Sequence, residues 1–144
     1  MILMIPVPLL DTSVLIAHLR GSSPSATQTI SEIIKGPQKG AISILTYYEI
    51  MKGAIDPFHK RQCKLIVRPF KIYGLTKGIA DIASQYYRSI PKNERCNILQ
   101  LDLLIAATAE YNRFHLITLN RKDFERFPLT VQVIYLQQIS PTNP

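Results

Sequence analysis

The chain has 144 residues, of which 47% are hydrophobic and 19% are charged, so it is expected to form one globular domain and not a disordered chain. Lysine and arginine together number 17 against 10 aspartate and glutamate residues, which gives a net charge of +7. A basic surface makes nucleic acid a candidate partner, although many small proteins are basic for other reasons.

Short apolar segments alternate along the chain with segments of helical periodicity. The expected strands are 2–10, where Pro6 and Pro8 confine the regular ladder to the end, 41–45, 70–73, 115–119 and 131–136. The expected helices are 14–19, 25–35, one capped by Thr46, 58–68, one from Thr76 to about Ser89, 98–112 and 122–127. The expected loops are 21–24, 36–40 and 91–95. This alternation predicts an α/β layered fold with a largely parallel sheet over residues 1–139, followed by a short disordered tail at 140–144.

Three acidic residues stand alone inside apolar segments: Asp11, Glu49 and Asp102. A buried carboxylate is costly unless it is paired, hydrogen-bonded or bound to a cation. Asp11, Glu49 and residues 120–123 each follow an expected strand, and ligands of parallel sheets gather at the carboxyl ends of the strands. The sequence therefore predicts one shared pocket in which carboxylates bind a divalent metal ion.

Other chemistries find less support. Cys63 and Cys96 are isolated and lack the spacing of a zinc site, so both are expected to be reduced thiols of a cytoplasmic protein. The sequence contains no run of 18 or more apolar residues, so no membrane span is predicted. The densest basic stretch offers candidate phosphate contacts, with a solvated helix face as the alternative, and it consists of Lys60, Arg61, Lys64, Arg68 and Lys71.

Four segments resemble, in order, the motifs of PIN-domain ribonucleases. They are 9–16 (LLDTSVLI), 46–53 (TYYEIMKG), 102–109 (DLLIAATA) and 116–124 (LITLNRKDF). Leu119 stands where the family often has arginine, a departure that leaves the acids and Asn120 intact. Chain length and motif wording resemble the VapC-type toxins of toxin–antitoxin pairs in particular.

The resemblance implies a three-layer α/β/α sandwich around a central, mostly parallel sheet. It also implies a metal-dependent endoribonuclease that cuts structured RNA, usually transfer RNA, as a homodimer blocked by a small antitoxin. The implied catalytic and metal-binding acids are Asp11, Glu49, Asp102 and Asp123. Hard carboxylate oxygens suit Mg²⁺ or Mn²⁺. Thr12 or Ser13 would hydrogen-bond a carboxylate or a metal-bound water, and Asn120 would orient Asp123 or the scissile phosphate.

Each acid also has a purely structural interpretation. Asp11 is of a type that caps helices, and Glu49 would sit on a solvated stripe beside Lys52. Asp102 would cap or begin its helix, and Asp123 would be a first-turn acid favoured by the helix dipole. Because all four acids occur in the order of the family motifs, one shared site is favoured over four unrelated structural roles.

Two other functions compete with the nuclease hypothesis. One is a catalytically silent or housekeeping RNA-binding module that keeps the fold, and the intact acidic set argues against it. The other is a receiver-like domain phosphorylated on Asp11, which would require a neighbouring acidic pair and a downstream lysine at a strand end. Neither feature is evident in the sequence.

Overall fold

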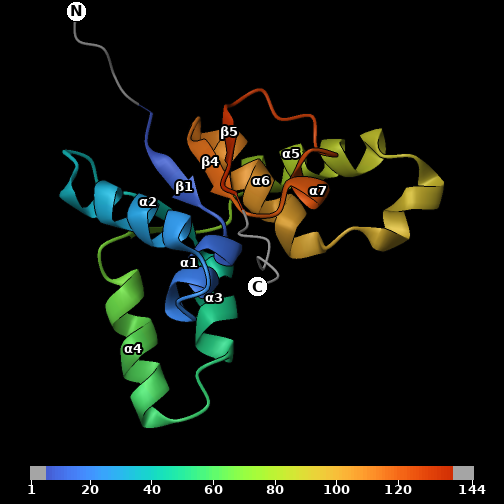
Figure 1. Cartoon of the computed structure of the whole chain (residues 1–144). Coiled ribbons are helices and arrows are strands. Elements are labelled where there is room, and N and C mark those ends of the chain that lie inside the picture. The colour runs from blue at the N-terminus through green and yellow to red at the C-terminus, as the bar shows by residue number, and fades with distance from the viewer. Residues whose placement is uncertain (1–5, 138–144) are drawn as a thin grey trace, which may run out of the picture.

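The computed structural model describes residues 6–137, which form a central sheet with helices on both faces (Figure 1). The strands are β1 (Pro8–Leu10), β2 (Ala41–Ser43), β3 (Lys71–Tyr73), β4 (His115–Thr118) and β5 (Val133–Tyr135). The helices are α1 (Thr12–Leu19), α2 (Pro24–Lys35), α3 (Ile44–Lys52), α4 (Pro57–Val67), α5 (Lys77–Ser89), the 3₁₀ helix η1 (Lys92–Asn97), α6 (Gln100–Asn112) and α7 (Arg121–Phe124). The tail predicted at 140–144 lies outside the described residues.

The sheet has five strands in the order β3-β2-β1-β4-β5, and every neighbouring pair is parallel. The predicted α/β/α fold with a parallel sheet is therefore confirmed. The order runs down from β3 to β1 and then continues with β4, so the direction of winding reverses between β1 and β4. A receiver domain has the order 2-1-3-4-5. The observed order therefore argues against the phospho-acceptor hypothesis.

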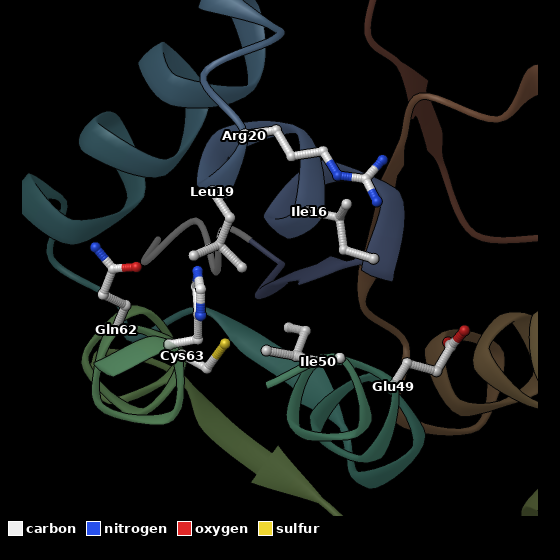
Figure 2. A pocket seen from close by; sticks show the side chains of 9 residues that line it. Ile16, Leu19, Arg20, Glu49, Ile50, Gln62 and Cys63 are labelled. Carbon is white, nitrogen blue, oxygen red and sulfur yellow. The ribbon is translucent and has the colours of Figure 1, made fainter. Parts of the chain in front are cut away.

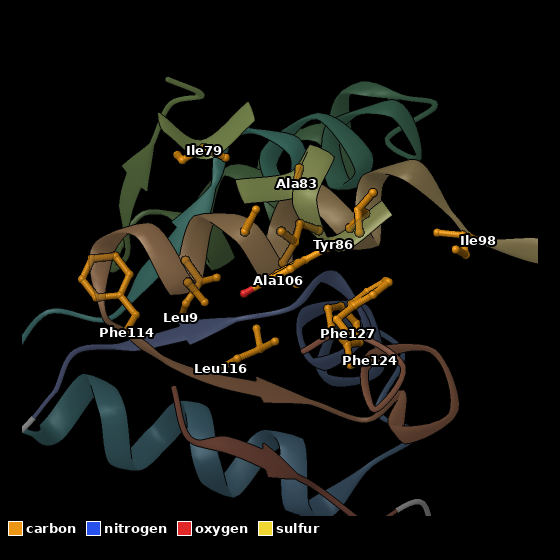
Figure 3. Close-up of a cluster of buried hydrophobic side chains, with 14 of the residues drawn as sticks. Leu9, Ile79, Ala83, Tyr86, Ile98, Ala106, Phe114, Leu116, Phe124 and Phe127 are labelled. Atoms are coloured by element: carbon orange, nitrogen blue, oxygen red, sulfur yellow. The ribbon is translucent and has the colours of Figure 1, made fainter. Parts of the chain in front are cut away.

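Alternate residues of the central strands feed two separate cores. Leu9 and Leu116, paired across β1 and β4, belong to one buried cluster, which includes Ala83 of α5 and Ala106 of α6 (Figure 3). The following residues of the same strands belong to a second cluster on the opposite face, with side chains from α1, α2 and α4. Parallel strands buried on both faces are continuously apolar, because neither face is exposed to water. This is why the strands read as unbroken hydrophobic runs in the sequence.

Two local predictions were wrong. The helix that carries Glu49 begins before Thr46, because the hydroxyl of Ser43 accepts a hydrogen bond from the backbone N–H of Leu45 at 3.1 Å and serves as the N-cap. The polar segment 91–95, expected to be a loop, instead lies largely in η1. By contrast, Thr76 caps α5 as predicted, accepting from the N–H of Ile79.

Within residues 6–137, no helix combines the length and the apolar character needed to cross a membrane.

Candidate active site

The predicted acidic residues lie at the carboxyl edge of the sheet. Asp11 comes directly after β1, Asp123 lies in α7 just after β4, and Glu49 is carried by α3, which follows β2. Asp102 reaches the same region from the first turn of α6. The crevice where the winding reverses, here between β1 and β4, is the usual ligand site of an open α/β sheet.

Asp11 is buried, with 2% of its surface exposed. It occupies the N-cap position of α1, but its side chain makes no capping hydrogen bond, so capping does not account for the carboxylate. Oδ2 accepts hydrogen bonds from Ser13 Oγ at 2.7 Å and from Thr118 Oγ1 at 2.8 Å. Oδ1 is buried and has no hydrogen-bond partner among the described residues. Burial raises the pKa of Asp11, and the two hydroxyl donors oppose that rise.

The hydroxyls that donate to Asp11 are themselves fixed by backbone amides. Ser13 Oγ accepts from the N–H of Leu119 at 3.1 Å, and Thr118 Oγ1 accepts from the N–H of Asn120 at 2.9 Å. A hydroxyl has a single proton, so these contacts leave each proton for the carboxylate. The bonds run from α1 to the end of β4 and thus join two segments that are distant in sequence.

Glu49 is held by a hydroxyl from α1. Thr12 Oγ1 lies 2.8 Å from Glu49 Oε1 and 2.9 Å from Thr46 Oγ1. Thr12 Oγ1 is the donor in both contacts, so its single proton is shared between the Glu49 carboxylate and the hydroxyl oxygen of Thr46. Thr12 and Ser13 therefore support carboxylates directly, one of the two roles expected from the sequence. No ion pair between Glu49 and Lys52 is formed in the described part of the chain, and Lys52 lies over the ring of Tyr48 instead.

Asp102 is half-buried, and its Oδ2 is buried without a hydrogen-bond partner among the described residues. Burial raises its pKa to about 7, and the negative charges of Asp11, Asp123 and Glu49 add to the rise. Arg126 acts in the opposite direction. Asp11, Asp123 and Glu49 therefore lie close enough to Asp102 to act on its charge, and these four acids make up the acidic cluster.

Asp123 differs from the other acids because both of its oxygens are engaged. Asn120 Nδ2 donates to Oδ2 at 2.6 Å, as the sequence suggested when it assigned Asn120 an orienting role. Arg126 Nη2 donates to Oδ1 at 2.8 Å in a partly buried ion pair.

Three residues of the network were not assigned to the site from the sequence: Thr46, Thr118 and Arg126. Thr118 comes beside Asp11 because Leu10 pairs with Ile117 in the parallel β1–β4 ladder. The sequence shows that both segments are strands, but it does not show that they are neighbours. Arg126 follows Asp123 by three residues, a spacing at which neighbouring turns bring side chains together. That spacing was the one feature of the sequence that could have assigned Arg126 to the site.

The fit of the acidic cluster to a metal ion depends on which of its oxygens lack hydrogen-bond donors. Within residues 6–137, no three His, Cys, Asp or Glu side chains are grouped closely enough to form a ready-made metal-binding set. Two carboxylate oxygens nevertheless remain buried without hydrogen-bond donors from the described part of the chain, Asp11 Oδ1 and Asp102 Oδ2. A buried carboxylate oxygen requires a hydrogen bond or a cation, and a divalent ion with oxygen preference would supply a cation to such oxygens. The donor chemistry therefore fits Mg²⁺ or Mn²⁺.

The raised pKa of Asp102 predicts how metal-free stability depends on pH. Between the ordinary value of 3.8 and about 7, the folded protein binds more protons than the unfolded chain. Stability therefore falls as pH rises through this window. In EDTA, the melting temperature of the wild type is expected to decrease from pH 5 to pH 8, and Asp102→Asn is expected to show a smaller decrease. Equal decreases in the two proteins would show that Asp102 does not titrate in this range.

The profile of the PIN domain family matches residues 9–128. Ribonuclease VapC19 of Mycobacterium tuberculosis is 31% identical over 127 residues, with 83% of this chain and 94% of the relative covered. Ribonuclease VapC10 of the same species is 33% identical over 120 residues, with 83% of this chain and 86% of the relative covered.

Solved structures agree with the sequence relatives. A toxin–antitoxin complex from Klebsiella pneumoniae contains a chain that is 29% identical, with a TM-score of 0.67 and coverage of 84% of this chain and 92% of that one. The structure of VapBC-1 from nontypeable Haemophilus influenzae gives a TM-score of 0.74 at 24% identity, over 90% of this chain and 97% of that one, which supports the fold. With four motifs in order and the acids gathered at one sheet edge, the chain belongs to the PIN domain family and, within it, to the VapC-type proteins.

Proposed function

We propose that this protein is a Mg²⁺-dependent endoribonuclease toxin that acts in the cytoplasm and is inhibited by a cognate antitoxin. The observation that carries the proposal is the pair of buried carboxylate oxygens of Asp11 and Asp102 at the switch point of the sheet, which have no hydrogen-bond partner within residues 6–137. The relatives VapC19 and VapC10 are named ribonucleases, which supports RNA as the substrate.

Asp11 and Asp102 would hold the ion, and Glu49 would complete the acidic set. The ion supplies water activation and charge neutralisation for phosphodiester hydrolysis. Ser13 and Thr118 keep the Asp11 carboxylate in a fixed orientation by donating to one of its oxygens, which leaves the other for the cation. Thr12 does the same for Glu49. Such hydroxyl contacts hold ligands in place before substrate binds, so little reorganisation is needed during the reaction.

The surface around the acids suits a polyanion. Arg20 lines two hollows, one together with Glu49 and the other together with Ser13 and Leu119. In α4, the basic side chains Lys60, Arg61 and Lys64 are exposed and form no ion pair within residues 6–137. We propose that these cations bind phosphates of a structured RNA, with transfer RNA the first candidate.

A cavity of about 340 Å³ between α1, α3 and α4 is the proposed place for the antitoxin (Figure 2). Ile16, Leu19 and Ile50 give it an apolar lining, and Arg20 and Glu49 lie at its edge. A peptide with apolar side chains would bind here and cover the approach to the acids. The similarity to a chain of a toxin–antitoxin complex supports an antitoxin as the partner. We also propose that the toxin itself forms a homodimer.

The proposal is tested by incubating the purified protein with total RNA. Cleavage is expected in Mg²⁺ or Mn²⁺ and is expected to stop in EDTA, since the carboxylates alone do not activate water. Expression in cells is expected to arrest growth, and co-expression of a short upstream reading frame is expected to relieve the arrest. RNA binding without cleavage in any metal, together with normal growth, would favour a silent RNA-binding module.

A further inference from the structure

Asp123 is the acid of the cluster whose two carboxylate oxygens both accept a hydrogen bond from a neighbouring side chain. Asn120 occupies Oδ2 at 2.6 Å and Arg126 occupies Oδ1 at 2.8 Å. Charge-assisted hydrogen bonds of this length are among the strong ones in proteins. A metal ion that bound Asp123 directly would have to share an oxygen with one of these two donors.

The other three acids are arranged differently. Asp11 Oδ1 and Asp102 Oδ2 are buried and lack donors among the described residues. Glu49 accepts one side-chain hydrogen bond, from Thr12 to Oε1, and none is recorded to Oε2 within residues 6–137. Among the described residues, three acids thus keep one oxygen without a recorded donor, whereas both oxygens of Asp123 accept hydrogen bonds.

Arg126 is the residue that Asp123 holds in place. The side chains of Arg126 and Asp123 are 27% and 24% exposed, so the ion pair is at the edge of the site and in contact with solvent. Its charge acts on Asp102, which places the guanidinium beside the acidic cluster. Asp123 uses one of the five N–H donors of the guanidinium, and Nε is buried without a partner among the described residues.

We infer that Asp123 is a positioning residue, which fixes Arg126 at the edge of the acidic cluster, and that Arg126 binds a phosphate of the RNA substrate. This inference rests on the proposed function. A guanidinium matches the geometry of a phosphate, and one that is already fixed by a carboxylate loses less freedom when the phosphate binds. The metal ion is held by the remaining acids.

The test compares Asp123→Asn, Arg126→Gln, their double variant and Arg126→Lys with the wild type. Titration calorimetry measures the dissociation constant for Mn²⁺, and fluorescence anisotropy in EDTA measures binding of labelled bulk transfer RNA. Asp123→Asn and Arg126→Gln are expected to keep Mn²⁺ affinity within about threefold of the wild type. Each is expected to weaken RNA binding by about tenfold, as expected for a supporting contact. The double variant is expected to lose no more than either single variant, because the two residues act as a unit. Arg126→Lys, which keeps the charge, is expected to recover part of the loss.

Lys77→Gln is the matched control, because Lys77 forms an exposed ion pair with Asp81 at 3.8 Å on α5 and its loss changes the net charge equally. It is expected to alter RNA binding by less than about twofold. A loss of Mn²⁺ binding in Asp123→Asn as large as in Asp11→Asn would show that Asp123 is a ligand and would overturn the inference. RNA binding by Arg126→Gln equal to that of the Lys77→Gln control would also overturn it. Absence of Mn²⁺ binding in the wild type would instead contradict the proposed function. The RNA-binding measurement in EDTA would still test the role of Arg126. Melting curves confirm that each variant is folded.

Discussion

Asp11→Asn is expected to lower RNA cleavage by about a thousandfold or more while leaving the metal-free protein at least as stable as the wild type. Asp11 is buried, and burial of its negative charge disfavours folding. Asparagine has the same shape but no charge, so that cost disappears, and its side-chain oxygen still accepts from Ser13 and Thr118. The cation, however, loses a ligand. The measurements are the initial rate of RNA cleavage in Mg²⁺ and the melting temperature in EDTA.

Asp81→Asn is the control for this prediction, since it makes the same chemical change at an exposed position of α5. It is expected to leave cleavage unchanged. Full activity of Asp11→Asn would eliminate Asp11 from the reaction. A strong fall in the melting temperature, with activity lost in proportion, would mean that Asp11 is needed for the fold and not for the chemistry.

Phe124→Ala is expected to lower the free energy of unfolding by about 3–5 kcal/mol. α7 has four residues, too few to be stable as an isolated helix, and its N-cap makes no side-chain capping hydrogen bond. Phe124 is fully buried and packs edge-on against Phe127 at a centroid distance of 5.8 Å, so this side chain anchors α7 to the core (Figure 3). Because Asp123 precedes Phe124, the same substitution also releases the Asp123–Arg126 pair. Urea denaturation measures the change.

Phe58→Ala provides the comparison, because it removes the same kind of side chain from an exposed position. Phe58 lies at the start of α4 and is 63% exposed. It is expected to change stability by less than about 0.5 kcal/mol. Similar destabilisation by the two substitutions would contradict the view that Phe124 anchors α7 through its burial.

Much of the fold was predictable because both faces of this sheet are buried. Apolar runs such as the one that ends in Leu9 and Leu10 are read as strands, and the helices between them follow from periodicity and from caps such as Thr76. The start of α3 was misplaced because Ser43 and Thr46 are both capping residue types and a sequence does not show which hydroxyl meets the free amide. The 3₁₀ helix η1 was missed because its polar residues resemble a loop.

The candidate site was predictable in its acids and less so in the residues that hold them. Asp11 stands out because a charge between two apolar segments needs a reason. Thr118 carries no such signal, since a threonine at the end of a strand is ordinary and its contact with Asp11 depends on the pairing of β1 with β4. The engagement of both Asp123 oxygens depends on side-chain conformation and is likewise absent from the sequence. The sequence thus indicates which acids gather, and the contacts distinguish their roles.

The central claim is that Asp11 and Asp102 hold a divalent cation at the switch point of the sheet. Calorimetric titration of Mn²⁺ into the wild type, Asp102→Asn and Asp81→Asn tests it most directly, because it needs no RNA substrate. The wild type and Asp81→Asn are expected to bind Mn²⁺ with equal affinity, and Asp102→Asn is expected to bind at least about thirtyfold more weakly, as loss of a ligand requires. Equal Mn²⁺ affinity in all three proteins would contradict the claim.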